Sequence, residues 1–232
     1  MEMIKKNKDL LKGILAIFLY FGLSLFKTLP FYMCNIDYNN VSEDIKLIYS
    51  FVFMILLMSI MLIIFYDRLQ RDLSDILDNH KTYYSGAMKY YLIGLVFMFI
   101  SNFIVIFGLG NGLNGNEIIV RSAIKEHYVY MLISAIIYAP IVEELIFRQS
   151  VENIFGRTIT FVVVSAFIFS GVHAIVGVQE LADLVSIIPY LGISVSFAYM
   201  LYKYDNIFVS MGFHFMHNGV MMAFQFLVLL LS

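Results

Sequence analysis

The sequence predicts an all-α protein: a polytopic bundle of transmembrane helices with about seven spans. Hydrophobic residues make up 61% of the 232 residues, charged residues only 14%, and the mean hydropathy is +0.84. A chain of this composition has too few polar residues to cover the surface of a water-soluble globular protein. The apolar stretches are about 20 residues long, enough to cross roughly 30 Å of hydrocarbon as a helix, whereas a membrane barrel shows alternating runs of about ten residues.

The first apolar run, from Ile14 to Phe26, follows a cluster of lysines and superficially imitates a secretory signal. No small-residue cleavage site follows it, so we interpret it as the first span. Between six and eight spans fit the sequence, and their ends are defined to within a few residues. We place them near residues 13–33, 46–66, 89–109, 129–150, 160–180, 184–202 and 206–231.

Basic residues fall in alternate connections, which predicts a cytoplasmic N-terminus. The residues concerned are Lys5, Lys6, Lys8, Arg68, Arg71, Lys81, Arg157 and Lys203. Acidic loops near residues 37–44 and 180–183 would then face outside. Lys27, Arg121 and Lys125 run against this assignment.

The segment between residues 67 and 89 is charged, with apolar residues at helical spacing. It is expected either to lie on the membrane surface or to form a solvated connecting helix. Glycines from Gly108 to Gly115 indicate a flexible loop, and no phosphate-binding motif follows them. We see no second domain, so residues 1–232 are expected to form a single integral membrane domain.

Several partner classes can be assigned or excluded from composition. A net charge of −2 and the lack of a basic stripe exclude nucleic acid as a partner, which leaves the lipid bilayer and a membrane-associated peptide or protein. The single cysteine, Cys34, excludes an internal disulfide. Richness in Ile, Asn, Lys and Tyr suggests an A+T-rich bacterial gene, so the expected location is the bacterial plasma membrane.

Three polar constellations interrupt the later apolar segments. They are Glu143-Glu144-x-x-x-Arg148, Phe169-x-x-x-His173 and His214-x-x-x-Asn218. A charged residue at the centre of a membrane helix costs roughly 2.5–3.5 kcal/mol, and such residues usually mark function. A spacing of four residues puts Glu144 and Arg148 on one helix face, and it does the same for the two ends of each of the other two motifs. We therefore expect one buried site, in which Glu144 pairs with Arg148 and Glu143 is free to address the bundle interior.

Together and in this order, these motifs resemble the CAAX protease and bacteriocin-processing family, also called the Abi family, which includes the type II CAAX prenyl endopeptidases. The resemblance covers roughly residues 129–225, the expected catalytic core. Every signature position is filled, and the one flanking departure is Gln149, where members commonly carry glycine.

The resemblance implies an intramembrane endopeptidase that cleaves a membrane-associated peptide or protein. Glu143 would be the general base and would hold a water together with His173. His214 and Asn218 would donate hydrogen bonds to the oxyanion. The supporting residues would be Glu144, Arg148 and Phe169, of which Glu144 and Arg148 orient Glu143.

Two questions stay open on the sequence. The family has been described both as metal-independent glutamate proteases and as metalloproteases. We expect no cofactor, because no H-E-x-x-H motif occurs; the alternative is zinc bound by Glu143, His173 and His214. The functional alternative is a non-catalytic bacteriocin immunity protein or membrane peptide-binding adaptor. A transporter is disfavoured, because the chain is short and lacks repeated halves.

Overall fold

The protein is an all-helical bundle in the computed structural model, and the predicted fold class is confirmed. The structure describes residues 2–108, 115–176, 178 and 181–231, and no β-strand occurs in these ranges. Its elements are α1 (Glu2–Leu25), α2 (Leu29–Met33), η1 (Tyr38–Asn40), α3 (Glu43–Ile64), α4 (Tyr66–Phe103), η2 (Ile104–Gly108), α5 (Gly115–Ile133), η3 (Ser134–Tyr138), α6 (Ala139–Glu143), η4 (Glu144–Gln149), α7 (Ser150–Phe155), α8 (Ile159–Ile175), η5 (Leu181–Ser186), α9 (Ile187–Tyr204) and α10 (Ile207–Leu231).

Several predicted boundaries differ from the observed helices. The span predicted to begin near residue 129 lies in a helical segment that begins at Gly115, and α8 ends at Ile175 instead of near residue 180. The first apolar run does not continue to residue 33, because α1 ends at Leu25 and a turn separates it from the short α2. The charged segment 67–89 and the apolar span 89–109 form one continuous helix, α4, extended by η2. No proline interrupts this stretch, so the change from polar to apolar composition does not break the helix.

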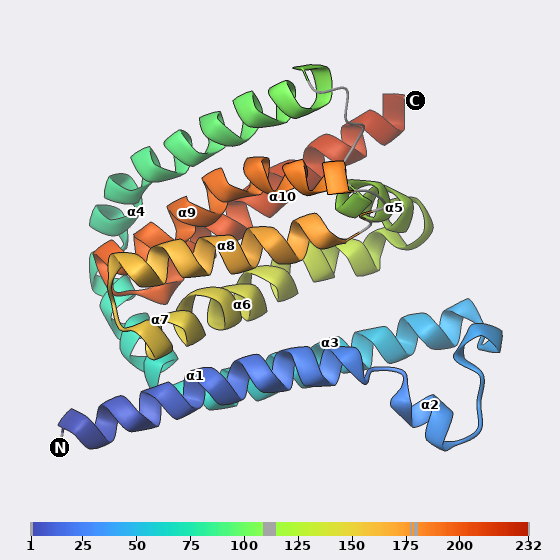
Figure 1. The fold of residues 1–232 in the computed structure, drawn as a ribbon, viewed down its shortest axis with the longest axis horizontal. Helices are drawn as coiled ribbons and strands as arrows, with labels where there is room; N and C mark the ends of the chain where they lie inside the picture. Colours follow the sequence, from blue (N-terminus) through green and yellow to red (C-terminus); the bar gives the residue numbers. More distant parts are fainter. Residues whose placement is uncertain (1, 109–114, 177, 179–180, 232) are drawn as a thin grey trace.

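The long helices alternate in direction (Figure 1). Helices α1 and α3 form one antiparallel pair, and α4, α9, α8 and α10 lie with the α5–α7 segment beside it. In the part of the chain that the structure describes, five helical stretches are long and apolar enough to cross a membrane: Glu43–Ile64, Tyr66–Gly108, Glu117–Phe155, Asp183–Tyr204 and Ile207–Val228. The helix at Ile159–Ile175 is apolar but shorter. A total of about seven spans stays a prediction.

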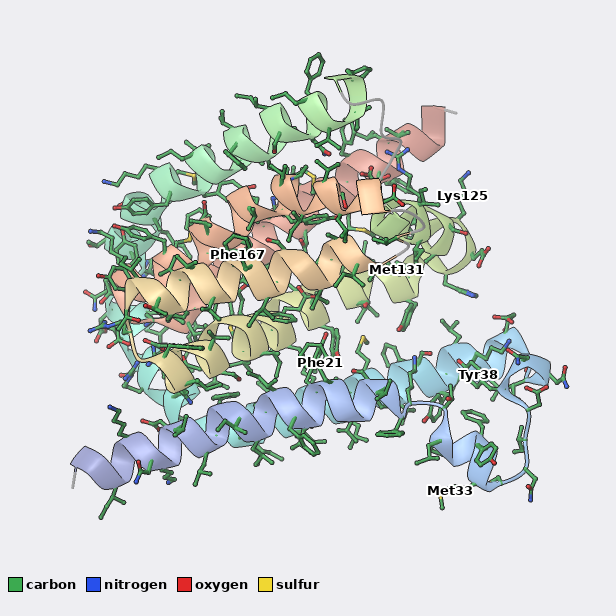
Figure 2. The ribbon with its side chains drawn as sticks, in the orientation of Figure 1. Phe21, Met33, Tyr38, Lys125, Met131 and Phe167 are labelled. Atoms are coloured by element: carbon green, nitrogen blue, oxygen red, sulfur yellow. The ribbon has the colours of Figure 1, made fainter. Side chains whose placement is uncertain are left out.

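Large apolar side chains cover the outside of the bundle (Figure 2). Phe167 on α8 is 55% exposed and Phe21 on α1 is 41% exposed. In water such a surface would be unstable, whereas lipid tails can cover it.

Short, well-capped connections fix the helices that carry the polar motifs. Gly156 has φ +71°, a left-handed conformation that glycine adopts without strain, and it ends α7. Two residues later the Thr158 hydroxyl accepts a hydrogen bond from the Phe161 amide and caps α8. The α8 helix is thereby folded back against the segment that carries the glutamates.

A buried ionic cluster fixes the start of α10. The Asp72 carboxylate, 1% exposed, accepts hydrogen bonds from the Arg68 Nε and the Ile207 backbone amide, both at 2.8 Å. Asn206 is fully buried and donates to the Asp72 carbonyl and the Asp75 carboxylate. Since anions stabilise helix N-termini, the cluster sets the position of α10 relative to α4.

Helices α4 and α9 cross at very close range. A Cβ atom at Gly94 would lie 2.1 Å from the Ser196 Oγ and 2.6 Å from the Gly192 carbonyl oxygen. Small residues therefore permit this crossing, as in many membrane helix pairs.

Candidate active site

Side chains from three helical segments meet at Glu143, the last residue of α6. The Glu143 Oε2 lies 3.9 Å from the His173 Nε2 and 3.7 Å from the His214 Nε2. The side chains of Glu143 and His173 are 17% and 21% exposed, and that of His214 is 4% exposed. The structure thus brings together three of the four residues that the sequence predicts as catalytic, with a partly accessible carboxylate between two imidazoles.

The neighbouring glutamate forms a second, fully buried layer. The Glu144 Oε1 accepts a hydrogen bond of 2.9 Å from the His214 Nδ1, and the Glu144 Oε2 lies 3.5 Å from the Arg148 Nε. The side chains of Glu144 and Arg148 are both 0% exposed. The predicted pairing between them is therefore confirmed, and His214 connects this layer to Glu143.

Both imidazoles are oriented through their Nδ1 atoms. The His173 Nδ1 lies 2.9 Å from the Phe169 carbonyl oxygen, and the His214 Nδ1 contacts the Glu144 carboxylate. Oxygen partners at Nδ1 fix the ring and leave the Nε2 atom facing the reaction site. In both residues this Nε2 atom faces Glu143.

Aromatic rings surround the buried ions. The Phe169 ring stacks on His173 at a centroid distance of 4.2 Å, and the Arg148 guanidinium carbon lies 4.1 Å from the Phe169 centroid. The Phe197 ring stacks on His214 at 5.1 Å. A guanidinium over an aromatic face is stabilised by the ring quadrupole. Phe169 therefore contacts both the His173 ring and the buried cation.

Serine hydroxyl groups connect α8, α9 and the η4 segment. The Ser165 hydroxyl on α8 donates to the Phe147 carbonyl oxygen. The Ser194 hydroxyl on α9 donates to the Ala166 carbonyl oxygen at 3.2 Å and accepts from an Arg148 terminal nitrogen at 3.4 Å. The segment between Glu144 and Gln149 is a π-helix, a widened turn that often occurs at functional sites.

Asn218 and Gln149 contact other groups. The Asn218 side-chain amide donates to the Ala135 carbonyl oxygen at 2.8 Å and is partly buried. Its second N–H is not used by that bond. The Gln149 amide donates to side-chain oxygens of Glu152 and Asn153 at 3.0 and 2.8 Å. Gln149, the residue that departs from the family pattern, therefore makes polar contacts beside the site.

Sequence reasoning missed Phe197 and Ser194, which contact His214 and Arg148 from α9. Both belong to an apolar helix and have no charged residue close to them in the sequence, so no motif distinguishes them. Only the packing of α9 against α8 and η4 reveals their role.

Zinc, the cofactor alternative, would bind to Glu143, His173 and His214. One carboxylate and two imidazoles with oxygen partners at Nδ1 are ligand types that zinc accepts. The distances of 3.7 and 3.9 Å are a few tenths of an ångström wider than the roughly 3.4 Å between ligand atoms on a tetrahedral zinc ion. Among the described residues no group of three or more acidic, histidine or cysteine side chains is close enough to hold a metal ion. Zinc would therefore require the three side chains to move slightly closer.

Comparison with known proteins gives one match. Residues 125–220 match the family model "Type II CAAX prenyl endopeptidase Rce1-like". No curated protein and no solved structure matches the chain. The matched segment contains all three polar motifs and excludes α1 to α4. The resemblance predicted from the motifs is confirmed, and residues 125–220 relate this integral membrane protein to the Rce1-like family of intramembrane CAAX-type proteases.

Proposed function

We propose that this protein is an intramembrane endopeptidase in which Glu143 activates a water molecule for attack on a peptide bond. The observation that carries the proposal is the placement of the Glu143 Oε2 within 3.9 Å of two imidazole Nε2 atoms. A carboxylate flanked by two oriented imidazoles can accept a proton from water, and the imidazoles can stabilise the charges that form during the attack. The match of residues 125–220 to the family model supports the same reaction class.

In the proposed reaction, Glu143 takes a proton from a water that His173 also contacts. The water oxygen attacks the carbonyl carbon, and the carbonyl oxygen becomes an oxyanion. Glu143 then returns the proton to the departing amide nitrogen, so the two products are a carboxylic acid and an amine. No covalent bond to the protein is needed.

His214 and Asn218 would stabilise the oxyanion. The Glu144 carboxylate accepts the hydrogen bond from the His214 Nδ1 and fixes the ring, so that a protonated His214 would donate to the oxyanion through its Nε2–H. The free N–H of Asn218 would be the second donor. Each such donor contributes roughly 3–4 kcal/mol in well-studied enzymes. In this account Glu144 and Arg148 are positioning residues, because they act through His214 and Glu143.

The proposed mechanism needs no cofactor. A zinc ion held by Glu143, His173 and His214 would supply Lewis-acid activation of the attacking water. The two distances from the Glu143 Oε2, which are a few tenths of an ångström longer than a zinc site requires, favour the metal-free form. Activity that survives exhaustive chelation would support it further, and loss of activity that zinc restores would contradict it.

The expected substrate is a peptide or protein held at the membrane, in keeping with a site inside the helical bundle. A quenched fluorescent peptide library, prenylated and unprenylated, presented to detergent-purified protein tests the activity. Wild type should cleave at least one peptide, and His173→Ala should reduce that turnover by at least a hundredfold. Equal background rates for both proteins would favour the non-catalytic immunity or adaptor function.

A further inference from the structure

Lys27 is a half-buried cation that takes no part in the proposed reaction. It follows the end of α1, and its Nζ donates to the Ser50 hydroxyl on α3 at 2.9 Å. The same Nζ lies 5.6 Å from the centre of the Phe53 ring. No acidic side chain in the described part of the chain lies within ion-pair distance of it. A partly desolvated ammonium group without a counter-charge favours binding of an anion.

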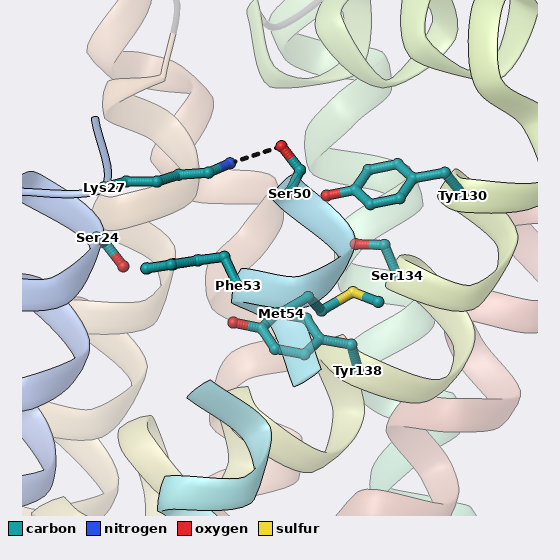
Figure 3. A pocket seen from close by; sticks show the side chains of 8 residues that line it. All are labelled: Ser24, Lys27, Ser50, Phe53, Met54, Tyr130, Ser134 and Tyr138. Carbon is teal, nitrogen blue, oxygen red and sulfur yellow. Dashed lines mark hydrogen bonds between the residues drawn. The ribbon is translucent and has the colours of Figure 1, made fainter. Parts of the chain in front are cut away.

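The Lys27 ammonium faces a pocket of about 200 Å³ between α1, α3 and the α5–η3 segment (Figure 3). Its polar lining is otherwise made of hydroxyl groups, from Ser24, Ser50, Tyr130, Ser134 and Tyr138. Figure 3 shows the hydroxyl ends of Tyr130 and Ser134 turned toward the part of α3 that carries Ser50. Ammonium and hydroxyl donors can satisfy several lone pairs of one oxyanion. The chemistry of this pocket therefore suits a carboxylate.

The pocket and the catalytic site lie along the same helical segment. Tyr138 and Ser134 line the pocket, and they precede Glu143 by five and nine residues. At 1.5 Å per residue these positions lie about 7–14 Å from Glu143 along the axis. The α1 helix extends over both regions, since the Tyr20 ring packs at 5.9 Å from the Phe147 ring beside the site.

We propose that Lys27 and its surrounding hydroxyls bind a carboxylate of the peptide that the Glu143 site cleaves. The inference rests on the proposed endopeptidase function. An extended peptide advances about 3.3 Å per residue, so a carboxylate bound beside Tyr138 or Ser134 belongs two to four residues from the scissile bond. It is either the C-terminal carboxylate or an Asp or Glu side chain. Lys27 and Ser50 lie outside the matched family segment, so this preference is a property of the present chain.

The first test measures binding, using protein with Glu143→Gln so that peptides stay intact. Fluorescent peptides are matched in sequence and carry either a terminal acid or amide, or an internal Glu or Gln placed at successive positions along the peptide. The protein is placed in nanodiscs of phosphatidylcholine. One carboxylate-bearing series should bind at least tenfold more tightly than its neutral partner, because the ammonium supplies a charge-assisted hydrogen bond. The series that shows the effect identifies which carboxylate is bound.

Adding Lys27→Gln should reduce this tenfold ratio to below twofold, and Lys27→Arg should retain most of it. Lys46→Gln is the matched control, since Lys46 pairs with Glu43 near the start of α3 and does not line the pocket. It should keep the full ratio. Ser50→Ala removes the contact to Lys27 but keeps the charge, so it tests the pocket if Lys27→Gln unfolds the protein.

Equal binding of acidic and neutral peptides, or a ratio that Lys27→Gln and Ser50→Ala leave unchanged, would overturn the subsite. The subsite would also be overturned if Lys27→Gln changed peptide binding only when the nanodisc contains phosphatidylglycerol. The anion at Lys27 would then be a lipid headgroup and not a peptide carboxylate. A cleavage arm separates the two proposals. If wild type cleaves no peptide but the binding ratio depends on Lys27, the endopeptidase proposal fails and the carboxylate site stands. If cleavage depends on Glu143 but shows no charge preference, only the subsite fails.

Discussion

Removing Arg148 should be among the most destabilising single changes in this protein. The guanidinium is 0% exposed, lies 3.5 Å from the Glu144 carboxylate and stacks at 4.1 Å on Phe169. Arg148→Met keeps an unbranched side chain of similar length but leaves the buried Glu144 carboxylate without its arginine partner, although the hydrogen bond to His214 stays. Breaking a buried ion pair from one side costs about 3–5 kcal/mol of unfolding free energy.

The double variant Glu144→Gln/Arg148→Met should cost less than Arg148→Met alone. It removes the unpaired charge, and replacing both partners of a buried pair is often close to neutral. We therefore expect a total loss of about 1–2 kcal/mol and a coupling energy of at least about 2 kcal/mol between the two positions. Denaturant titration in mixed micelles, followed through the near-ultraviolet circular dichroism of the tyrosines, measures these values.

Arg121 offers a matched control, because it pairs with Glu117 at the same four-residue spacing but is 37% exposed. Arg121→Met should cost less than about 1 kcal/mol, the usual value of an exposed ion pair. If Arg148→Met costs no more than this control, or if the two changes in the buried pair are simply additive, the reasoning about the buried layer is refuted.

Three further predictions concern the site and its supports. Asn218→Ala should lower kcat by roughly 10²–10³-fold with little change in KM, the result expected for loss of an oxyanion donor, and a loss of stability alone would assign Asn218 to its contact with Ala135. Gly94→Val should destabilise the fold by at least about 1–3 kcal/mol, because the added atoms overlap Ser196, and an unchanged unfolding midpoint would contradict the close crossing. Asp72→Asn should cost about 1.5–3 kcal/mol through weaker bonds to charged donors, and a native-like denaturation curve would show that the ionic cluster is dispensable.

Much of the site could be predicted from the sequence, because its residues lie in short motifs. A spacing of four residues on one helix is enough to place Glu144 beside Arg148 and Phe169 beside His173. Because an isolated charge in a membrane is costly, the polar motifs are then expected to lie close together in one site. The distances between helices could not be predicted, since they depend on close crossings and on the π-helical turn that begins at Glu144.

The relative depth of the two histidines illustrates this limit. His173 is the fifteenth residue of α8, whereas His214 is the eighth residue of α10. Counting along the helices therefore places them at different depths, yet both Nε2 atoms lie within 3.9 Å of one Glu143 oxygen. Helices tilt and begin at different levels, so sequence position does not determine depth. The contacts from Phe197 and Ser194 have the same origin in tertiary packing.

The catalytic role of Glu143 is tested most directly by a single turnover in H₂¹⁸O. Wild-type protein in excess over a cleavable peptide should release a product whose new carboxyl group carries one ¹⁸O atom, as attack by water requires. Glu143→Gln protein with an unchanged unfolding midpoint should release none above background. A first turnover without ¹⁸O would show that a side-chain oxygen attacks instead of water, and normal cleavage by the Glu143→Gln protein would contradict the proposed role of Glu143.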